Sequence, residues 1–89
     1  MRQVLQRRKF FRDLTRQIQR GKDIEELFSI VRVLAQYGRL PEQFRPHKLS
    51  GKYEGLWECH IAHDWLLIYE ITDDTLILAR TGTHADLFE

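Results

Sequence analysis

The spacing of apolar residues changes partway along this 89-residue chain, and that change limits the fold more than any other feature. Between residues 8 and 37 apolar side chains recur at helical spacing, whereas between residues 56 and 81 they alternate or run together as in strands. Helices that precede the strands, rather than alternate with them, indicate an α+β domain with the helices on one face of a sheet.

The first helix is expected from Arg8 to Arg20, because its apolar residues fall within an arc of about 100°. Those residues, which we expect to be buried, are Phe10, Phe11, Leu14 and Ile18. Gly21 is suited to end this helix, since glycine readily adopts the left-handed conformation of a helix C-terminus.

A second helix is expected to open at Asp23, with Glu26 completing a variant of the capping box. It keeps one apolar face up to Tyr37 and ends at Gly38. The apolar face comprises Ile24, Leu27, Phe28, Val31, Leu34 and Ala35. The short turn between the two helices makes them antiparallel.

Strands are expected at residues 3–6 (a short edge strand), 56–62, 65–71 and 75–81, with a long loop over residues 38–55. In the strand 56–62, Trp57, Cys59 and Ile61 alternate toward the core, away from Glu58, His60 and Ala62. The almost continuously apolar strand 65–71 is typical of a central strand covered on both faces. The prediction is one domain, residues 1–89, of order β-α-α-β-β-β, with two antiparallel helices on one face of a small antiparallel sheet.

The formal net charge of +1 hides two opposed blocks. Residues 1–22 hold eight basic residues and a single acidic one, Asp13, whereas residues 53–89 hold eight acidic residues and a single basic one, Arg80. Such asymmetry indicates contact with nucleic acid or with an oppositely charged partner. The alternative is that the two blocks pair with each other in the folded chain.

Four arginines of the basic block recur every fourth residue and form one stripe on the first helix: Arg8, Arg12, Arg16 and Arg20. Like charges at this spacing repel one another. We therefore interpret this arginine stripe as a surface for an anionic partner, with a simple solvated face as the alternative.

Several function classes lack their sequence signals. No apolar run approaches the length of a membrane span, and the first residues have no apolar stretch of signal-peptide length. A single cysteine, Cys59, excludes an internal disulfide framework and fits a reducing cytoplasm. Phosphate-loop, dinucleotide and nucleophile-elbow motifs are absent, so we expect no cofactor.

Metal binding and cysteine chemistry are also disfavoured. Neither the single cysteine nor the scattered histidines match the ligand spacing of a structural zinc site. His60 and His63 are three residues apart, which turns their side chains to opposite faces of an extended strand. Alternation directs Cys59 into the core, where a nucleophile is of no use.

General acid–base catalysis remains, because three of the four histidines can meet at one edge of a meandering sheet. Cleavage of RNA by its own 2′-hydroxyl needs a base, an acid and cations for the charge on the phosphorane. The proton-transfer candidates are His47, His60, Asp64 and His84; the cation candidates are Arg80, Lys48 and Lys52. Phe88 either stacks on a base or packs back onto the sheet.

Five blocks of this chain together resemble the YafQ branch of the RelE/ParE superfamily of bacterial toxins. They are Leu40-Pro41, His47-x-Leu49-x-Gly51, Gly55-x-x-Glu58-x-His60, Asp64-Trp65-Leu66-Leu67-Ile68-Tyr69 and Arg80-Thr81-Gly82-Thr83-His84-Ala85-x-Leu87-Phe88. The spacing of the blocks agrees with that branch, whereas the two helices match it only in pattern. One departure is Glu58, where the family pattern favours aspartate.

The resemblance implies a ribosome-dependent endoribonuclease that cuts mRNA in the A site without a metal and is silenced by a cognate antitoxin. By motif position His47, His60, Asp64 and His84 are its acid–base groups, with His84 as general acid. Arg80 matches the phosphate-binding arginine, and Phe88 matches an aromatic residue that affects cleavage. The expected partners are therefore an antitoxin, mRNA and the RNA of the ribosome, with no membrane.

Two other functions compete with this hypothesis. A non-enzymatic toxin of the ParE kind would share the fold and bind DNA gyrase, but would not need histidines in matching motif blocks. A nucleic-acid-binding module would depend on the arginine stripe alone.

Overall fold

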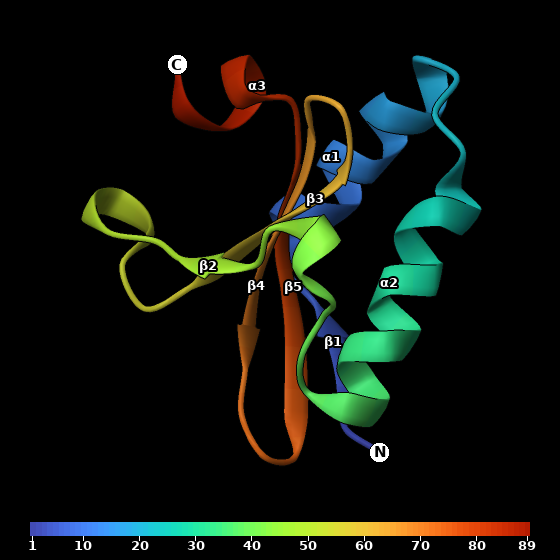
Figure 1. Ribbon diagram of the computed structural model, residues 1–89. Coiled ribbons are helices and arrows are strands. Elements are labelled where there is room, and N and C mark those ends of the chain that lie inside the picture. Colours follow the sequence, from blue (N-terminus) through green and yellow to red (C-terminus); the bar gives the residue numbers. More distant parts are fainter.

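A five-stranded sheet in the order β1-β5-β4-β3-β2 organises the molecule (Figure 1). The computed structural model describes every residue from Met1 to Glu89. The strands are β1 (Gln3–Gln6), β2 (His47–Lys48), β3 (Trp57–Ala62), β4 (Trp65–Ile71) and β5 (Thr75–Gly82). β4 lies in the middle, and all five of its residues from Trp65 to Tyr69 are buried, which confirms the predicted central strand.

The sheet is mixed, and this corrects the prediction of an antiparallel sheet. β2, β3, β4 and β5 pair antiparallel, but β1 pairs with β5 in parallel, with Val4 opposite Leu76. Parallel neighbours need a connection that returns the chain to the starting end of the sheet. The connection from β1 to β5 begins with α1 and α2, which lie in the helical layer above the sheet.

Two antiparallel helices cover one face of the sheet, as expected (Figure 1). α1 spans Arg8–Gln19 and α2 spans Ile24–Tyr37. Asp23 caps α2, but it accepts from the amide of Glu25 at 3.0 Å, so the capping box predicted with Glu26 does not form. Gly38 ends α2 in the left-handed conformation, with φ +75° and its amide bonded to the Leu34 carbonyl.

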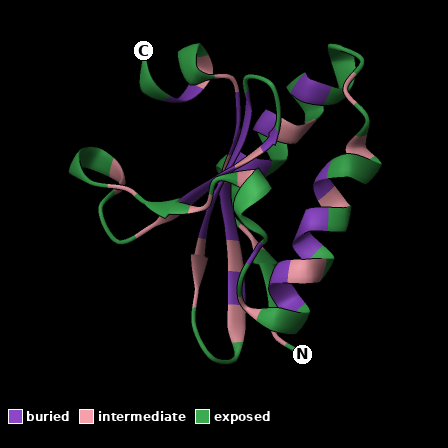
Figure 2. Cartoon of the chain, in the orientation of Figure 1, coloured by how far each residue is buried: buried purple, intermediate pink, exposed green.

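The main core fills the space between the helices and the sheet (Figure 2). Leu27, Ile30 and Leu34 of α2 pack there against Cys59, Leu67 and other sheet residues. A smaller cluster of Leu66, Ile68, Ala79 and Leu87 lies on the opposite face. Its cover consists of the segment around Leu49, Tyr53 and Leu56 and a short helix that the sequence did not predict, α3 (His84–Phe88).

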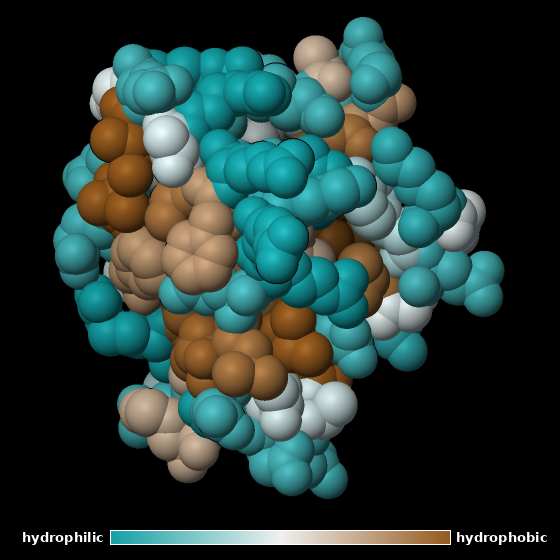
Figure 3. All heavy atoms as spheres, turned by 180° about the vertical axis from the view of Figure 1, so that it is seen from behind, coloured by the Kyte–Doolittle hydropathy of each residue, from teal (hydrophilic) through white to brown (hydrophobic).

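α1 is rotated relative to the prediction. Of the four apolar residues expected to be buried, only Phe10 is fully enclosed, whereas Phe11 and Ile18 remain 55% and 51% exposed. The buried positions are instead Phe10, Asp13 and Gln17, so the helix presents a partly polar face to the protein. On the face of the molecule seen from behind, apolar patches border hydrophilic ones (Figure 3).

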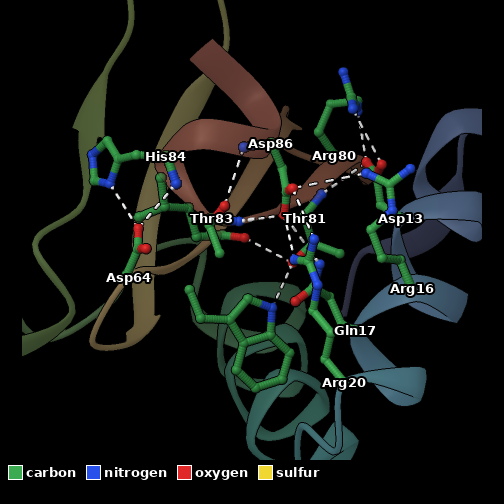
Figure 4. A network of polar contacts seen from close by, with 12 residues as sticks. Asp13, Arg16, Gln17, Arg20, Asp64, Arg80, Thr81, Thr83, His84 and Asp86 are labelled. Atoms are coloured by element: carbon green, nitrogen blue, oxygen red, sulfur yellow. Dashed lines mark hydrogen bonds and ion pairs between the residues drawn. The ribbon is translucent and has the colours of Figure 1, made fainter. Parts of the chain in front are cut away.

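Asp86 of α3 explains part of this rotation (Figure 4). Its carboxylate accepts from Arg20 at 2.6 and 3.1 Å and from Gln17 at 3.4 Å, and so joins α1 to α3. It also accepts from the Thr83 amide at 2.9 Å within a capping box that begins α3. The contacts from Arg20 and Thr83 hold the pKa of Asp86 well below its ordinary value, against the opposing effect of burial.

The segment 38–55, expected to be a loop, contains three short pieces of structure. These are 3₁₀ turns at Glu42–Phe44 and Gly51–Tyr53, and the two residues of β2 between them. None of the helices has both the length and the apolar character required to cross a bilayer.

We predict that Asp86→Asn lowers the free energy of unfolding at neutral pH. A carboxyl group with a lowered pKa stabilises the fold above its unfolded-state value, near 3.8, and loses that contribution as the pH falls toward its folded-state value. The difference between parent and variant should therefore shrink below about pH 4 in thermal unfolding experiments. Asp73→Asn, in the exposed β4–β5 turn, is the control and should match the parent throughout. A difference that does not depend on pH would contradict this account.

Candidate active site

The four predicted acid–base residues come from four different segments, and three of them, His60, Asp64 and His84, lie toward one end of the sheet. His47 is in β2, His60 in β3, Asp64 in the β3–β4 turn and His84 at the start of α3. Figure 1 shows the β3–β4 turn and α3 at one end of the sheet. The structure resolves these residues into two groups, one around Asp64 and one around Glu58.

His84 is held by Asp64 through two contacts to one oxygen (Figure 4). The His84 amide donates to Asp64 Oδ1 at 3.0 Å, and His84 Nδ1 lies 3.1 Å from the same atom. The hydrogen bond from the His84 amide, and to a lesser extent the contact with the His84 ring, lower the pKa of Asp64 below its ordinary value. This carboxylate is therefore ionised at neutral pH. Nδ1 therefore carries a proton toward Asp64, which leaves Nε2 as the atom that can gain or lose one.

The local backbone places Asp64 for this role. The residue occupies the two-residue turn of the β3–β4 hairpin with φ 51°, in the left-handed region. Aspartate adopts that region more readily than most residues do. The turn thus directs the carboxylate toward the first residue of α3, twenty positions further along the chain.

Glu58 lies between the other two histidines. Its Oε1 is 3.2 Å from His47 Nε2 and 3.8 Å from His60 Nε2, and the side chain is only 4% exposed. His47 Nδ1 also lies 2.9 Å from the Arg45 carbonyl, which can only accept a hydrogen bond. Both nitrogens of His47 therefore face acceptors, whereas His60 has no second partner.

His60 is suited to act as a base. Burial lowers its pKa below 6.5, with Glu58 opposing and the neighbouring Arg45, His84 and His47 adding to the effect. A neutral imidazole can accept a proton at physiological pH. The ring centroids of His60 and His84 are 6.1 Å apart, which leaves room for a phosphate to contact both side chains.

The side chain of Arg80 is held in place by Asp13 of α1. Its Nε and Nη2 donate to the two oxygens of Asp13 at 2.6 and 3.1 Å, and its Nη1 donates to the Tyr53 hydroxyl at 3.2 Å. The bond to Asp13 is the main reason why the pKa of Arg80 is raised above its ordinary value. A guanidinium has five N–H groups, so these three contacts leave two for a ligand.

The sequence left two possibilities for Phe88, stacking on a base or packing onto the protein, and the structure combines features of both. Its ring packs edge-on against Tyr53, with centroids 5.5 Å apart, and lies 5.9 Å from the His84 ring. The residue is nevertheless 41% exposed. Phe88 is thus fixed beside His84 with surface free to contact a base.

The arginine stripe divides into two parts. Arg20 and Arg16 are engaged by Asp86, at 2.6 and 3.7 Å, whereas Arg8 and Arg12 make no ion pair. Part of the arginine stripe therefore pairs with the acidic block, and only Arg8 and Arg12 of the stripe remain free for an anionic partner. Lys48 and Lys52 lie against the rings of Trp57 and Tyr53, at 5.8 and 5.1 Å.

Sequence reasoning assigned no role in the site to three side chains that organise it: Asp13, Tyr53 and Glu58. Asp13 had a detectable signal, since it is the single acid of the basic block and binds the single base of the acidic block. The alternation of β3 placed Glu58 on the face of His60, but gave no sign that it would be buried. We find no signal for Tyr53 in the sequence.

The structure also bears on the sequence arguments against metal and cysteine chemistry. No three His, Cys, Asp or Glu side chains are arranged as a metal-binding group. Cys59 is fully buried, and burial raises the pKa of its thiol to about 12. Such a thiol is not a nucleophile at neutral pH.

Residues 2–89 match the family model for the bacterial toxin of type II toxin–antitoxin systems, YafQ. The mRNA interferase toxin YafQ of Escherichia coli K12 is 40% identical over 70 residues, which cover 78% of this chain and 76% of that protein. The E. coli DinJ–YafQ complex contains a similar chain, with a TM-score of 0.90, 33% identity and full coverage of both chains. A metal-bound toxin from Helicobacter pylori has a TM-score of 0.89 and 34% identity, covering 99% of this chain and 100% of that one.

We predict that Asp13→Asn costs about 2–3 kcal/mol of unfolding free energy, because the buried Asp13 carboxylate is the counter-charge of the partly buried Arg80 guanidinium. Chemical denaturation measures this directly. Glu25→Gln is the control, since its ion pair with Arg32 is exposed and should contribute less than about 1 kcal/mol. Equal stability of the two variants would show that the Asp13–Arg80 pair does not fix α1.

Proposed function

The chain belongs to the YafQ family of type II toxins, and from this membership we propose that it is an mRNA interferase that cuts mRNA in the A site of the ribosome. Residues 1–89 would form a single toxin domain that acts in the cytoplasm. The observation that carries the proposal is the pair of imidazoles, His60 and His84, whose rings lie 6.1 Å apart.

In the proposed reaction His60 takes the proton from the 2′-hydroxyl of the nucleotide before the cleaved bond. The hydroxyl oxygen then attacks the adjacent phosphorus, and the bond to the 5′ oxygen of the next nucleotide breaks. The lowered pKa of His60 supports this role, because the base must be neutral before reaction. His47 and Glu58 would position His60 and set the charge around it.

His84 would act as general acid. Asp64 holds Nδ1, so Nε2 presents the proton that the leaving 5′ oxygen receives.

Arg80 would stabilise the phosphorane, using the N–H groups that Asp13 and Tyr53 leave free. Phe88 would stack on a base next to the cleaved bond. Lys48, Lys52 and the unpaired Arg8 and Arg12 would contact phosphates of mRNA or ribosomal RNA. Arg16 and Arg20 would contribute less, because Asp86 already engages them.

We further propose that a cognate antitoxin neutralises the protein, as a related chain is found in the E. coli DinJ–YafQ complex. The reaction itself is proposed to need no metal, since the two histidines and Arg80 supply the base, the acid and the cation. Because a related toxin from H. pylori is known in metal-bound form, every cleavage experiment should be run with and without EDTA.

We predict that His84→Ala lowers cleavage of mRNA in a reconstituted translation reaction at least about 100-fold, the usual contribution of a general acid. Primer extension maps the cuts, and circular dichroism checks the fold. His63→Ala is the matched control, because this exposed histidine of the same turn as Asp64 has no proposed role. Undiminished cleavage by His84→Ala would remove His84 from the mechanism; absence of cleavage by the parent would overturn the proposed function.

We predict that the rate of cleavage rises with pH around a midpoint below 6.5, as His60 loses its proton. Glu58→Gln should shift this midpoint further down, because the Glu58 carboxylate favours protonated His60. Single-turnover rates on programmed ribosomes, measured over a pH series, test both statements. A midpoint that Glu58→Gln leaves unchanged would assign the base to another group.

A further inference from the structure

A pocket of about 470 Å³ opens next to Arg80, outside the group of histidines. Arg8 and Lys9 at the start of α1 form one wall, and Lys52, Tyr53 and Leu56 form another. Ala79 and Arg80 of β5, with Arg7 just before α1, complete the lining. The volume falls within the range of about 300–1,000 Å³ that is usual for small-molecule sites.

The charge on the lining is almost entirely positive. Five of the eight lining residues are basic, and none is acidic. Arg7 is engaged by Glu70 at 3.0 Å, and Arg80 is engaged by Asp13, but Arg8, Lys9 and Lys52 have no carboxylate partner. Three unpaired cations around one pocket would attract an anion strongly, and their attraction would fall with salt.

The backbone at the pocket wall adds to this preference. α1 begins at Arg8 with no side chain bonded to its free amide groups and no acidic residue in its first turn. The positive end of a helix dipole favours a phosphate there. This contribution supplements the side-chain charges and the pocket itself.

A series of ring contacts connects the histidines with the pocket. The His84 ring lies 5.9 Å from Phe88, and Phe88 lies 5.5 Å from Tyr53, which lines the pocket. The Tyr53 hydroxyl accepts from Arg80 and donates to the Leu87 carbonyl at 3.0 Å. These two hydrogen bonds fix the Tyr53 side chain between β5 and α3. A strand of RNA that leaves His84 across Phe88 and Tyr53 would therefore enter the pocket.

We propose that this pocket is a subsite for one further nucleotide of the mRNA strand, next to the cleaved bond. Arg8, Lys9 and Lys52 bind its phosphate, and Tyr53 and Leu56 contact its base. This inference rests on the proposed function, since it assumes that the cleaved strand crosses His84. It adds Lys9, Tyr53 and Leu56 to the residues that contact substrate.

The test measures binding of short single-stranded RNA that carries a 2′-deoxy nucleotide at the cleavage position, so that no cleavage occurs. Fluorescence anisotropy gives the affinity of the parent and of the double variant Lys9→Gln, Lys52→Gln over a salt series. We expect about tenfold weaker binding by the variant and a salt slope lower by about 0.7, the contribution of one phosphate on a single strand. Both lysines are exposed, so the fold should tolerate the change.

Arg39→Gln is the matched control, because Arg39 is exposed, has no ion pair and lines other pockets beside α2. It should bind RNA as the parent does. A second variant, Tyr53→Leu, should weaken binding about tenfold with an unchanged salt slope, since it removes stacking but no charge. Equal RNA affinity of the double variant and Arg39→Gln would overturn the subsite.

Vacant ribosomes distinguish mRNA from ribosomal RNA as the source of the phosphate. Loss of affinity for vacant ribosomes, with full affinity for the oligonucleotide, would overturn the assignment to mRNA. Cleavage by the parent on programmed ribosomes is measured in parallel. A parent that does not cleave would overturn the proposed function, whereas weaker oligonucleotide binding by the double variant would still support an RNA-binding pocket.

Discussion

The pair of Asp13 and Arg80 connects the fold to the candidate site. Asp13 is 7% exposed on the inner face of α1, and accepts from the side chain of Arg80 and from the Thr81 amide at 3.1 Å. The pair thereby holds α1 against β5 and fixes the Arg80 guanidinium. Because a buried carboxylate is unfavourable without its counter-charge, the position of α1 and the geometry of the site depend on the same contact.

The same principle explains how two opposed charge blocks coexist in one small domain. Some charges of the basic block are used within the molecule, through Asp86 and Glu70, and these contacts hold α1 against α3 and the sheet. Two other cations of the block, Arg8 and Lys9, line the pocket together with Lys52. Internal pairing thus leaves three cations without a carboxylate partner around the pocket, which a net charge of +1 does not reveal.

Much of the fold could be predicted from local patterns. The helical and strand periods, the ends at Asp23 and Gly38 and the central position of Trp65–Tyr69 all follow from short-range preferences of the chain. The predicted face of α1 was correct for Phe10 and Leu14 but wrong for Phe11 and Ile18, because periodicity counts only apolar side chains, whereas Asp13 and Gln17 are buried by polar contacts. α3 escaped prediction although Thr83 and Asp86 form a local capping box, whereas the parallel pairing of β1 depends on contacts between distant segments.

By itself, the sequence determined which residue types were available for the site and, through five motif blocks, which family they resembled. It assigned roles to His60, His84 and Arg80 without stating how they meet. Only the tertiary structure decided that Asp64 holds His84, that Glu58 lies between His47 and His60, and that Asp13 holds Arg80. Each of these contacts joins residues whose distance is set by strand register and helix packing, and local sequence preferences do not encode that geometry.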